Sequence, residues 1–311
     1  MRNSSTSEIL PKDLDINLKK ILFNYSDTID EIVNYGTYIL KIDYELKRDG
    51  KDNFVPTAFL RNCLELADGI SILVKSSSID PSKILLRTLL ENSLSLIFMI
   101  RENEKTRAHC YLVWKAHNEI KLCKKFIDEE QISKDFVKQL KKENQDFELD
   151  NIRDIKGILK TIEAKNTLLK LPFYKEVDEE YQKSKKKGKN YIRNWYSLYD
   201  GPLNFELLSK ELNSTLHYHF NYKKYSENVH AVNVLKAFIS TGNDLAQLRQ
   251  MRDFKDCREV FIEVIYLLLN LYNEFIEKRI PNEINNYPEW SKTFFEKFKK
   301  VLDDTQFNYI E

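Results

Sequence analysis

Glycine and proline, the residues that interrupt helices and form tight turns, number only seven each in 311 residues. That is about a third of the glycine content usual in globular proteins. Sheets joined by tight turns need more glycine, because many of those turns require a positive φ. The chain also contains 42% hydrophobic and 31% charged residues, which is enough apolar material for a substantial core. We therefore expect an all-α fold, a helical bundle of long helices.

Apolar residues recur at helical spacing along most of the chain. The expected helices cover residues 14–47, 56–73, 81–101, 104–127, 214–229 and 255–278. Asp80 suits the N-cap of the third helix, and Pro81 suits its first position, where the missing N–H would be unpaired anyway. We expect a disordered N-terminus over 1–12, a bundle domain over 13–280 and a C-terminal amphipathic segment over 281–311. The aromatic residues of that last segment favour packing on its own bundle over contact with a second copy. They are Trp290, Phe294, Phe295 and Phe298.

Residues 128–200 are rich in Lys, Glu, Asp and Gln, and their apolar periodicity is weak. They predict an inserted helical arm of two modest helices that ends at 171–173, followed by a basic loop over 183–189. The residues after this loop mix cations with aromatic rings, as single-strand binders do, although a charge run is more often a solvated loop. These residues are Tyr191, Arg193, Trp195 and Tyr196.

Positive and negative charges nearly cancel, with 49 Lys plus Arg against 48 Asp plus Glu. Nucleic acid or an anionic membrane is therefore no general expectation, and contact with RNA would need a local patch. The first seven residues are polar and lack the apolar stretch of a secretory signal, so we expect none. The most apolar window, Val260 to Leu271, contains Glu263 and is too short to span a bilayer. We expect a cytoplasmic protein without membrane contact. The four cysteines match no zinc spacing, so neither a metal site nor a cofactor is expected.

The third expected helix carries a polar stripe of Arg87, Thr88, Glu91, Asn92 and Ser95 on one face. The simplest interpretation is a solvated face. However, the stripe contains no lysine in a lysine-rich chain, which favours an internal polar network. Arg87 and Glu91 are four residues apart and can pair.

A second stripe lies on the helix expected over 214–229 and just beyond it. Wound as an α-helix, His219, Tyr222, Ser226 and His230 align on one side. No carboxylate or thiolate joins the histidines at ligand spacing, and no acid is placed to orient a serine–histidine nucleophile pair. Neither stripe can be buried without partners, so we predict that the two helices pack together. This would place Arg87 within hydrogen-bonding distance of Ser226 or His230, and Glu91 likewise.

Three short motifs together resemble the bacterial domain of unknown function 5677, over roughly residues 30–275 with 128–200 as an insertion. The motifs are the run 86–91, the later pair Arg107 and Tyr111, and Tyr225-Ser226 followed by His230. That family is related to the helical HEPN domains (higher eukaryotes and prokaryotes nucleotide-binding). The resemblance implies a HEPN-like helical bundle.

HEPN proteins often act as metal-independent RNases in toxin and phage-defence systems, with an arginine shortly before a histidine. The resemblance implies that His230 acts as general acid or base on the ribose 2′-OH while a cation stabilises the charged phosphorane. This chain departs from the pattern, because Lys223 or Lys224 stands where the arginine is expected. Lys223 shares the stripe of His230 and is the better substitute, but a lysine lacks the fork of a guanidinium. Arg87 or Arg107 is the alternative source of the cation.

The resulting hypothesis is an RNA-cleaving effector of a bacterial toxin or phage-defence system, with RNA as the substrate. The expected catalytic residues are His230, Arg87, Glu91 and Ser226, and the expected substrate-binding residues are Arg107, Tyr111, His219, Tyr222 and Lys223. Because HEPN sites are commonly completed across a dimer, a homodimer or a partner protein is also expected. The alternative is a non-catalytic helical module that binds a nucleotide or a partner protein through the same polar site. A third interpretation is a buried polar network that only fixes helix register.

Overall fold

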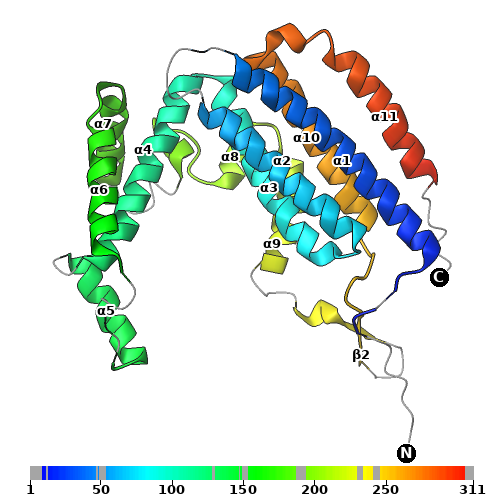
Figure 1. Ribbon diagram of the computed structural model, residues 1–311, viewed down its shortest axis with the longest axis horizontal. Coiled ribbons are helices and arrows are strands. Elements are labelled where there is room, and N and C mark those ends of the chain that lie inside the picture. The colour runs from blue at the N-terminus through cyan, green and yellow to red at the C-terminus, as the bar shows by residue number, and fades with distance from the viewer. Residues whose placement is uncertain are drawn as a thin grey trace, which may run out of the picture. The chain divides into compact units, whose positions relative to one another are not determined.

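The computed structural model describes residues 9–11, 13–46, 48, 54–127, 130–146, 148, 153–186, 194–229, 234–240 and 246–304. Most of the expected disordered stretch, 1–12, lies outside these residues. The described chain is helical apart from its connections and one two-stranded hairpin, which confirms an all-α helical bundle (Figure 1). It divides into two compact units, Met1–Glu102 with Leu208–Glu311, and Asn103–Leu207. None of the described helices is long and apolar enough to cross a membrane.

The first unit is a bundle of long helices. Its elements are α1 (Ile16–Glu45), α2 (Phe54–Lys75), α3 (Ile79–Arg101), a π-helical turn (His217–Tyr222), α9 (Lys223–Val229), β1 (Phe238–Ser240), β2 (Ala246–Leu248), α10 (Cys257–Arg279) and α11 (Tyr287–Asp304). α2 packs between α1 and α3, and α10 packs against both of them. Gly36 allows the close approach of α1 and α10, because a Cβ there would lie 2.2 Å from the Tyr272 hydroxyl. That hydroxyl donates a hydrogen bond to the carbonyl oxygen of Ile32, 2.9 Å away.

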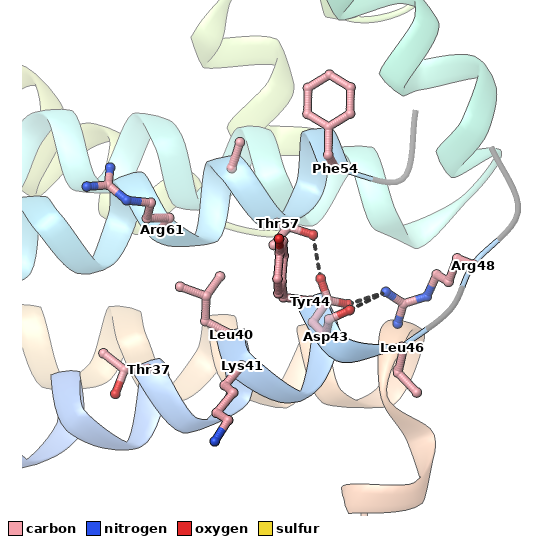
Figure 2. Close-up of a pocket in the computed structure, with 11 residues that line it drawn as sticks. Thr37, Leu40, Lys41, Asp43, Tyr44, Leu46, Arg48, Phe54, Thr57 and Arg61 are labelled. Atoms are coloured by element: carbon pink, nitrogen blue, oxygen red, sulfur yellow. Dashed lines mark hydrogen bonds and ion pairs between the residues drawn. The ribbon is translucent and has the colours of Figure 1, made fainter. Parts of the chain in front are cut away.

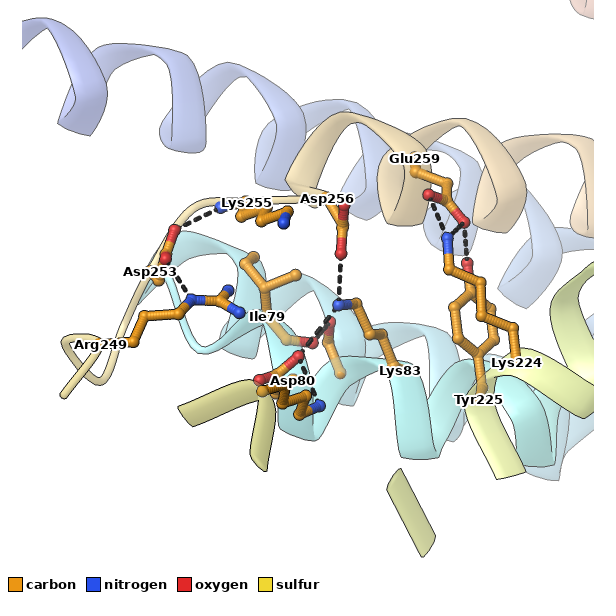
Figure 3. Close-up of polar contacts among 12 residues, drawn as sticks. Ile79, Asp80, Lys83, Lys224, Tyr225, Arg249, Asp253, Lys255, Asp256 and Glu259 are labelled. Carbon is orange, nitrogen blue, oxygen red and sulfur yellow. Dashed lines mark hydrogen bonds and ion pairs between the residues drawn. The ribbon is translucent and has the colours of Figure 1, made fainter. Parts of the chain in front are cut away.

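The start of α3 differs from the expected one. Ser78 is the N-cap residue, and Asp80 and Pro81 lie inside the first helical turn. The prediction of an Asp80 cap was wrong because its carboxylate is used elsewhere: it accepts a hydrogen bond from the Lys83 ammonium at 3.0 Å (Figure 3). Lys83 also donates to Asp256 at 2.7 Å, and its side chain is buried. This ion pair ties α3 to the residue that precedes α10.

The C-terminal helix α11 packs on its own bundle, as expected from its aromatic residues. The Trp290 ring stacks on Tyr35 at 3.5 Å between ring centres. Phe294 and Phe298 are buried, and the Phe298 ring lies 5.3 Å from that of Phe261 on α10. The described part of this segment ends at residue 304.

The second unit contains α4 (Glu104–Cys123), α5 (Gln131–Glu143), α6 (Ile155–Leu169) and α7 (Pro172–Lys186), and α8 (Phe205–Glu211) begins in it. The expected arm of two helices is therefore wrong, since α5, α6 and α7 are three. Pro172 was interpreted as the end of a helix. Proline also fits the first turn of a helix, and here it begins α7. α4 packs against α6, α7 and the short 3₁₀ turn Trp195–Ser197.

The basic segment is not a simple loop. Lys183, Lys185 and Lys186 form the last turn of α7, where cations interact favourably with the helix dipole. Residues 187–189, Tyr191 and Arg193 lie outside the described part of the chain. Trp195 and Tyr196 are 4% and 5% exposed, so neither ring is available to stack on a base. The interpretation of these two aromatic residues as part of a single-strand surface was wrong.

Candidate functional site

The polar stripe of α3 meets the π-helical turn and α9 at the guanidinium of Arg87. Its Nε donates to the Ser226 hydroxyl at 2.9 Å, and its Nη2 donates to the Tyr222 hydroxyl at 2.5 Å. The guanidinium carbon also lies 4.2 Å from the centre of the Tyr222 ring. On its own helix, Arg87 Nη1 reaches Glu91 at 3.4 Å. The predicted packing of the two helices is thus confirmed, and Arg87 makes the direct contact with Ser226.

Ser226 uses both sides of its hydroxyl in this contact. Its Oγ accepts from Arg87 and donates its single proton to the backbone carbonyl of Tyr222 at 2.6 Å. A serine nucleophile instead gives its proton to a neighbouring base. Ser226 therefore holds α9 against α3, and in this arrangement its hydroxyl is not presented as a nucleophile.

The π-helical turn His217–Tyr222 was not anticipated from the sequence. Each residue of a π-helix advances by a smaller angle than in an α-helix, so side chains after the turn are rotated relative to those before it. His219 consequently lies on the exposed side, with its ring edge-on to Tyr218 at 5.2 Å. The prediction that His219 shares one stripe with Tyr222 and Ser226 was wrong for this reason.

Contacts with α10 account for the π-helical turn. Asn221 donates to the Glu263 carboxylate at 2.6 Å. The Tyr225 hydroxyl donates to Glu259 at 2.8 Å (Figure 3). The rotation lets these residues face α10 while Tyr222 faces Arg87 on α3. One feature of the sequence indicated such contacts with α10: Glu263 is a charged residue inside the most apolar window of the chain.

Lys223 and Lys224 differ in how accessible their ammonium groups are to a ligand. Lys224 donates to both carboxylate oxygens of Glu259, each at 2.8 Å. Lys223 is exposed, and its ammonium lies 5.2 Å from the centre of the Tyr218 ring. Lys223 is therefore the cation that an anionic ligand reaches more easily, and its role in binding RNA stays a prediction.

Three candidate residues remain, Arg107, Tyr111 and His230. Arg107 and Tyr111 are half-buried on α4, in the second unit. The Tyr111 ring lies 6.5 Å from Trp114 and 6.1 Å from Trp195, and burial raises the pKa of its hydroxyl. His230 falls outside the described residues, four positions after Ser226.

The carboxyl group of Glu91 has a displaced pKa. Burial raises this pKa, the Arg87 guanidinium lowers it, and the net result is a raised value. Burial also raises the pKa of Tyr222, and the charge of Glu91 raises it further, against the opposing effect of Arg87. Burial thus opposes the charged form of both groups beside the half-buried guanidinium of Arg87.

A raised carboxyl pKa makes the stability of the fold depend on pH. Because folded Glu91 holds its proton more tightly than the unfolded chain does, its contribution is fully present below the unfolded pKa and is lost as the pH rises through the folded pKa. Glu91→Gln should therefore match the wild type in melting temperature near pH 4 and exceed it at pH 7. Because the Glu91 side chain is 40% exposed, the gain should be small. Differential scanning calorimetry across this range measures it, and a variant that loses stability relative to the wild type as the pH rises would contradict the assignment.

Within the described parts of the chain, no group of three or more His, Cys, Asp and Glu side chains is arranged to hold a metal ion. Cys63, Cys110 and Cys257 are buried, and burial raises the pKa of each thiol to about 12. These thiols are therefore protonated core residues and not reactive thiolates.

A family model described as a family of unknown function (DUF5677) matches residues 53–246. The match covers more than half of the chain and includes every candidate residue from Arg87 to His230. No curated protein and no solved structure matches the chain.

Proposed function

The chain belongs to the DUF5677 family, a family of unknown function, and we propose that it is a HEPN-like, RNA-cleaving effector of a bacterial toxin or phage-defence system. The observation that carries the proposal is the hydrogen bond between Arg87 and Ser226. It fixes a guanidinium beside the helix that leads, one turn later in sequence, to His230. A cation next to a histidine is the pair of groups that cleavage at the ribose 2′-OH requires.

The partners of Arg87 leave it suited to a phosphate. Tyr222 and Ser226 are neutral, and the contact with the Glu91 carboxylate is long, at 3.4 Å. The Arg87 side chain is 17% exposed and that of Glu91 is 40% exposed, so Glu91 is the partner that a phosphate of the substrate would displace. The raised pKa of Glu91 supports this exchange, because burial disfavours its charged form, the form that binds the guanidinium most strongly.

In the proposed reaction His230 takes the proton of a ribose 2′-OH, and the 2′ oxygen attacks the adjacent phosphorus. The bond to the 5′ oxygen breaks, that oxygen receives a proton, and a 2′,3′-cyclic phosphate remains. Arg87 stabilises the negative charge of the phosphorane. Exposed Lys223 and His219 bind the strand nearby, and a role of Arg107 and Tyr111 in binding RNA stays a prediction. A homodimer would supply a second His230.

A non-catalytic role is the second candidate, and one observation favours it. Arg87 Nε and Nη2 already donate to Ser226 and Tyr222, and Ser226 donates to the backbone, so this network is satisfied within the protein. A module that binds a nucleotide or a partner protein, or a network that only fixes helix register, needs no more than this.

Cleavage of RNA tests the proposal directly. The purified full-length protein is expected to cut single-stranded RNA in the presence of EDTA and to leave 2′,3′-cyclic phosphate and 5′-hydroxyl ends, which mass spectrometry of the fragments identifies. Arg87→Lys should slow cleavage because a lysine cannot replace the bidentate fork. Arg61→Lys, at an exposed arginine on α2, is the matched control and should cut normally. RNA left intact by the wild type, with and without candidate triggers, would favour the binding module.

A further inference from the structure

A second site lies in the first unit, where the end of α1 meets the beginning of α2. A pocket of about 600 Å³ opens there between residues 37–48 and 54–61 (Figure 2). Its volume falls within the range of about 300–1,000 Å³ typical of small-molecule sites. None of the described residues of the proposed RNA site lines it.

The polar part of the pocket is a carboxylate held by two guanidinium groups. Asp43 Oδ1 accepts hydrogen bonds from Arg48 Nη1 at 2.5 Å and from Arg279 Nε at 2.9 Å. Its Oδ2 accepts from the Thr57 hydroxyl at 2.6 Å and from Arg279 Nη2 at 3.1 Å. Asp43 and Arg279 are fully enclosed, whereas the side chain of Arg48 is 22% exposed. Of the two guanidinium groups that contact Asp43, Arg48 is thus the one that a ligand in the pocket can reach.

Among the described residues, Asp43 is the only carboxylate that pairs with Arg48, and Asp43 also pairs with Arg279. The other two hydrogen bonds of Arg48 go to the backbone carbonyls of Asp43 and Arg279, which carry no net charge. The carboxylate of Asp43 meanwhile accepts a bidentate pair from Arg279. The charge of Arg48 is therefore only partly balanced by the described side chains and favours a further anion.

The walls of the pocket are apolar and include large exposed side chains. Tyr44 is 81% exposed and Phe54 is 57% exposed (Figure 2). Leu40, one turn before Tyr44 on α1, and Ala58, one turn after Phe54 on α2, also line the pocket. Covering aromatic rings of this size with an apolar ligand removes a large area from water, which favours binding. The site therefore combines an apolar wall with the Arg48 cation, while Lys41 and Arg61, which also line the pocket, have carboxylate partners in Glu45 and Glu65.

We propose that this pocket binds a small amphipathic organic anion, with its acidic group on Arg48 and its apolar body against Tyr44, Phe54 and Leu40. A carboxylate, a sulfonate or a phosphate ester on an apolar body shares this chemistry. An inorganic anion does not, because it leaves the apolar walls exposed.

Two fluorescent dyes with the same aromatic body test the proposal on the full-length protein. 8-Anilinonaphthalene-1-sulfonate carries an acidic group, and N-phenyl-1-naphthylamine lacks it. The sulfonate should bind at one saturable site, about tenfold more tightly than the neutral dye, because a charge-assisted hydrogen bond is added. Decanoate should displace it, and inorganic phosphate should not. Displacement by phosphate alone would overturn the amphipathic requirement.

Variants locate the site and identify the cation. Ala58→Trp should fill the pocket and abolish binding of both dyes, whereas Ile72→Trp, at a 60% exposed position further along α2, should leave binding unchanged. Arg48→Gln should remove the preference for the sulfonate and leave the neutral dye bound, since Arg279 still pairs with Asp43. If Arg48→Gln lowers the melting temperature too far, Arg48→Lys replaces it and should keep most of the preference. Binding that survives Ala58→Trp, or an unchanged preference in Arg48→Gln, would overturn the proposal.

Discussion

Replacing Asp43 with alanine is expected to lower the free energy of unfolding by about 3–5 kcal/mol, because breaking a buried ion pair leaves an uncompensated charge. The Asp43 carboxylate is fully buried and accepts from Arg48, Arg279 and Thr57. Its removal takes away the two carboxylate hydrogen bonds of the Arg279 guanidinium, whose side chain is 1% exposed. Water cannot reach that group to compensate the loss, so most of the desolvation penalty appears as instability.

Urea denaturation followed by circular dichroism measures this effect. Asp13→Ala is the control, because Asp13 also pairs with a cation, Lys19, but its side chain is 89% exposed. Exposed pairs contribute about 0–1 kcal/mol, so this control should scarcely change the midpoint. A change below about 1 kcal/mol in Asp43→Ala would mean that the buried network contributes little beyond a surface ion pair.

Replacing His230 with alanine is expected to reduce RNA cleavage by about 10²–10⁴-fold, the usual cost of losing a general acid or base. Alanine cannot take the proton from the ribose 2′-OH, while the guanidinium of Arg87 stays fixed by Tyr222 and Ser226. Binding of a non-cleavable RNA with 2′-deoxyribose at the scissile position should therefore persist. The loss belongs to the chemical step and not to binding.

The melting temperature of the same preparation separates catalysis from support. If His230 had only a structural role in the core, His230→Ala would lower the free energy of unfolding by about 1–3 kcal/mol, because its hydrogen-bond partners would be left unpaired. Any loss of activity would then follow the fraction of folded protein. His117→Ala is the matched control, since His117 lies on α4 and pairs with Asp178 at 2.5 Å. Cleavage by His230→Ala at the rate of this control would remove His230 from the mechanism.

The candidate site was predictable from the sequence only as two separate stripes. Helical spacing placed Arg87 and Glu91 on one face, and the cost of burying polar groups predicted a partner helix. The contact of Arg87 with Ser226 followed from that argument. Periodicity could not anticipate the π-helical turn, because the turn is held by Asn221 and its contact with Glu263 on α10, more than 40 positions later.

Local chemistry by itself determined the helical class of this protein. A chain with seven glycines and seven prolines, and with apolar residues at a spacing of three and four, has few ways to bury its core except as helices. These signals act between near neighbours and need no knowledge of the fold. Tertiary structure decided what local signals leave open. The π-helical turn is held by the contact of Asn221 with Glu263, and Lys83 is buried because Asp256 joins Asp80 in accepting from it. The choice in each case depends on partners that only the packed chain brings near, because a polar group takes whichever partner offsets its loss of water.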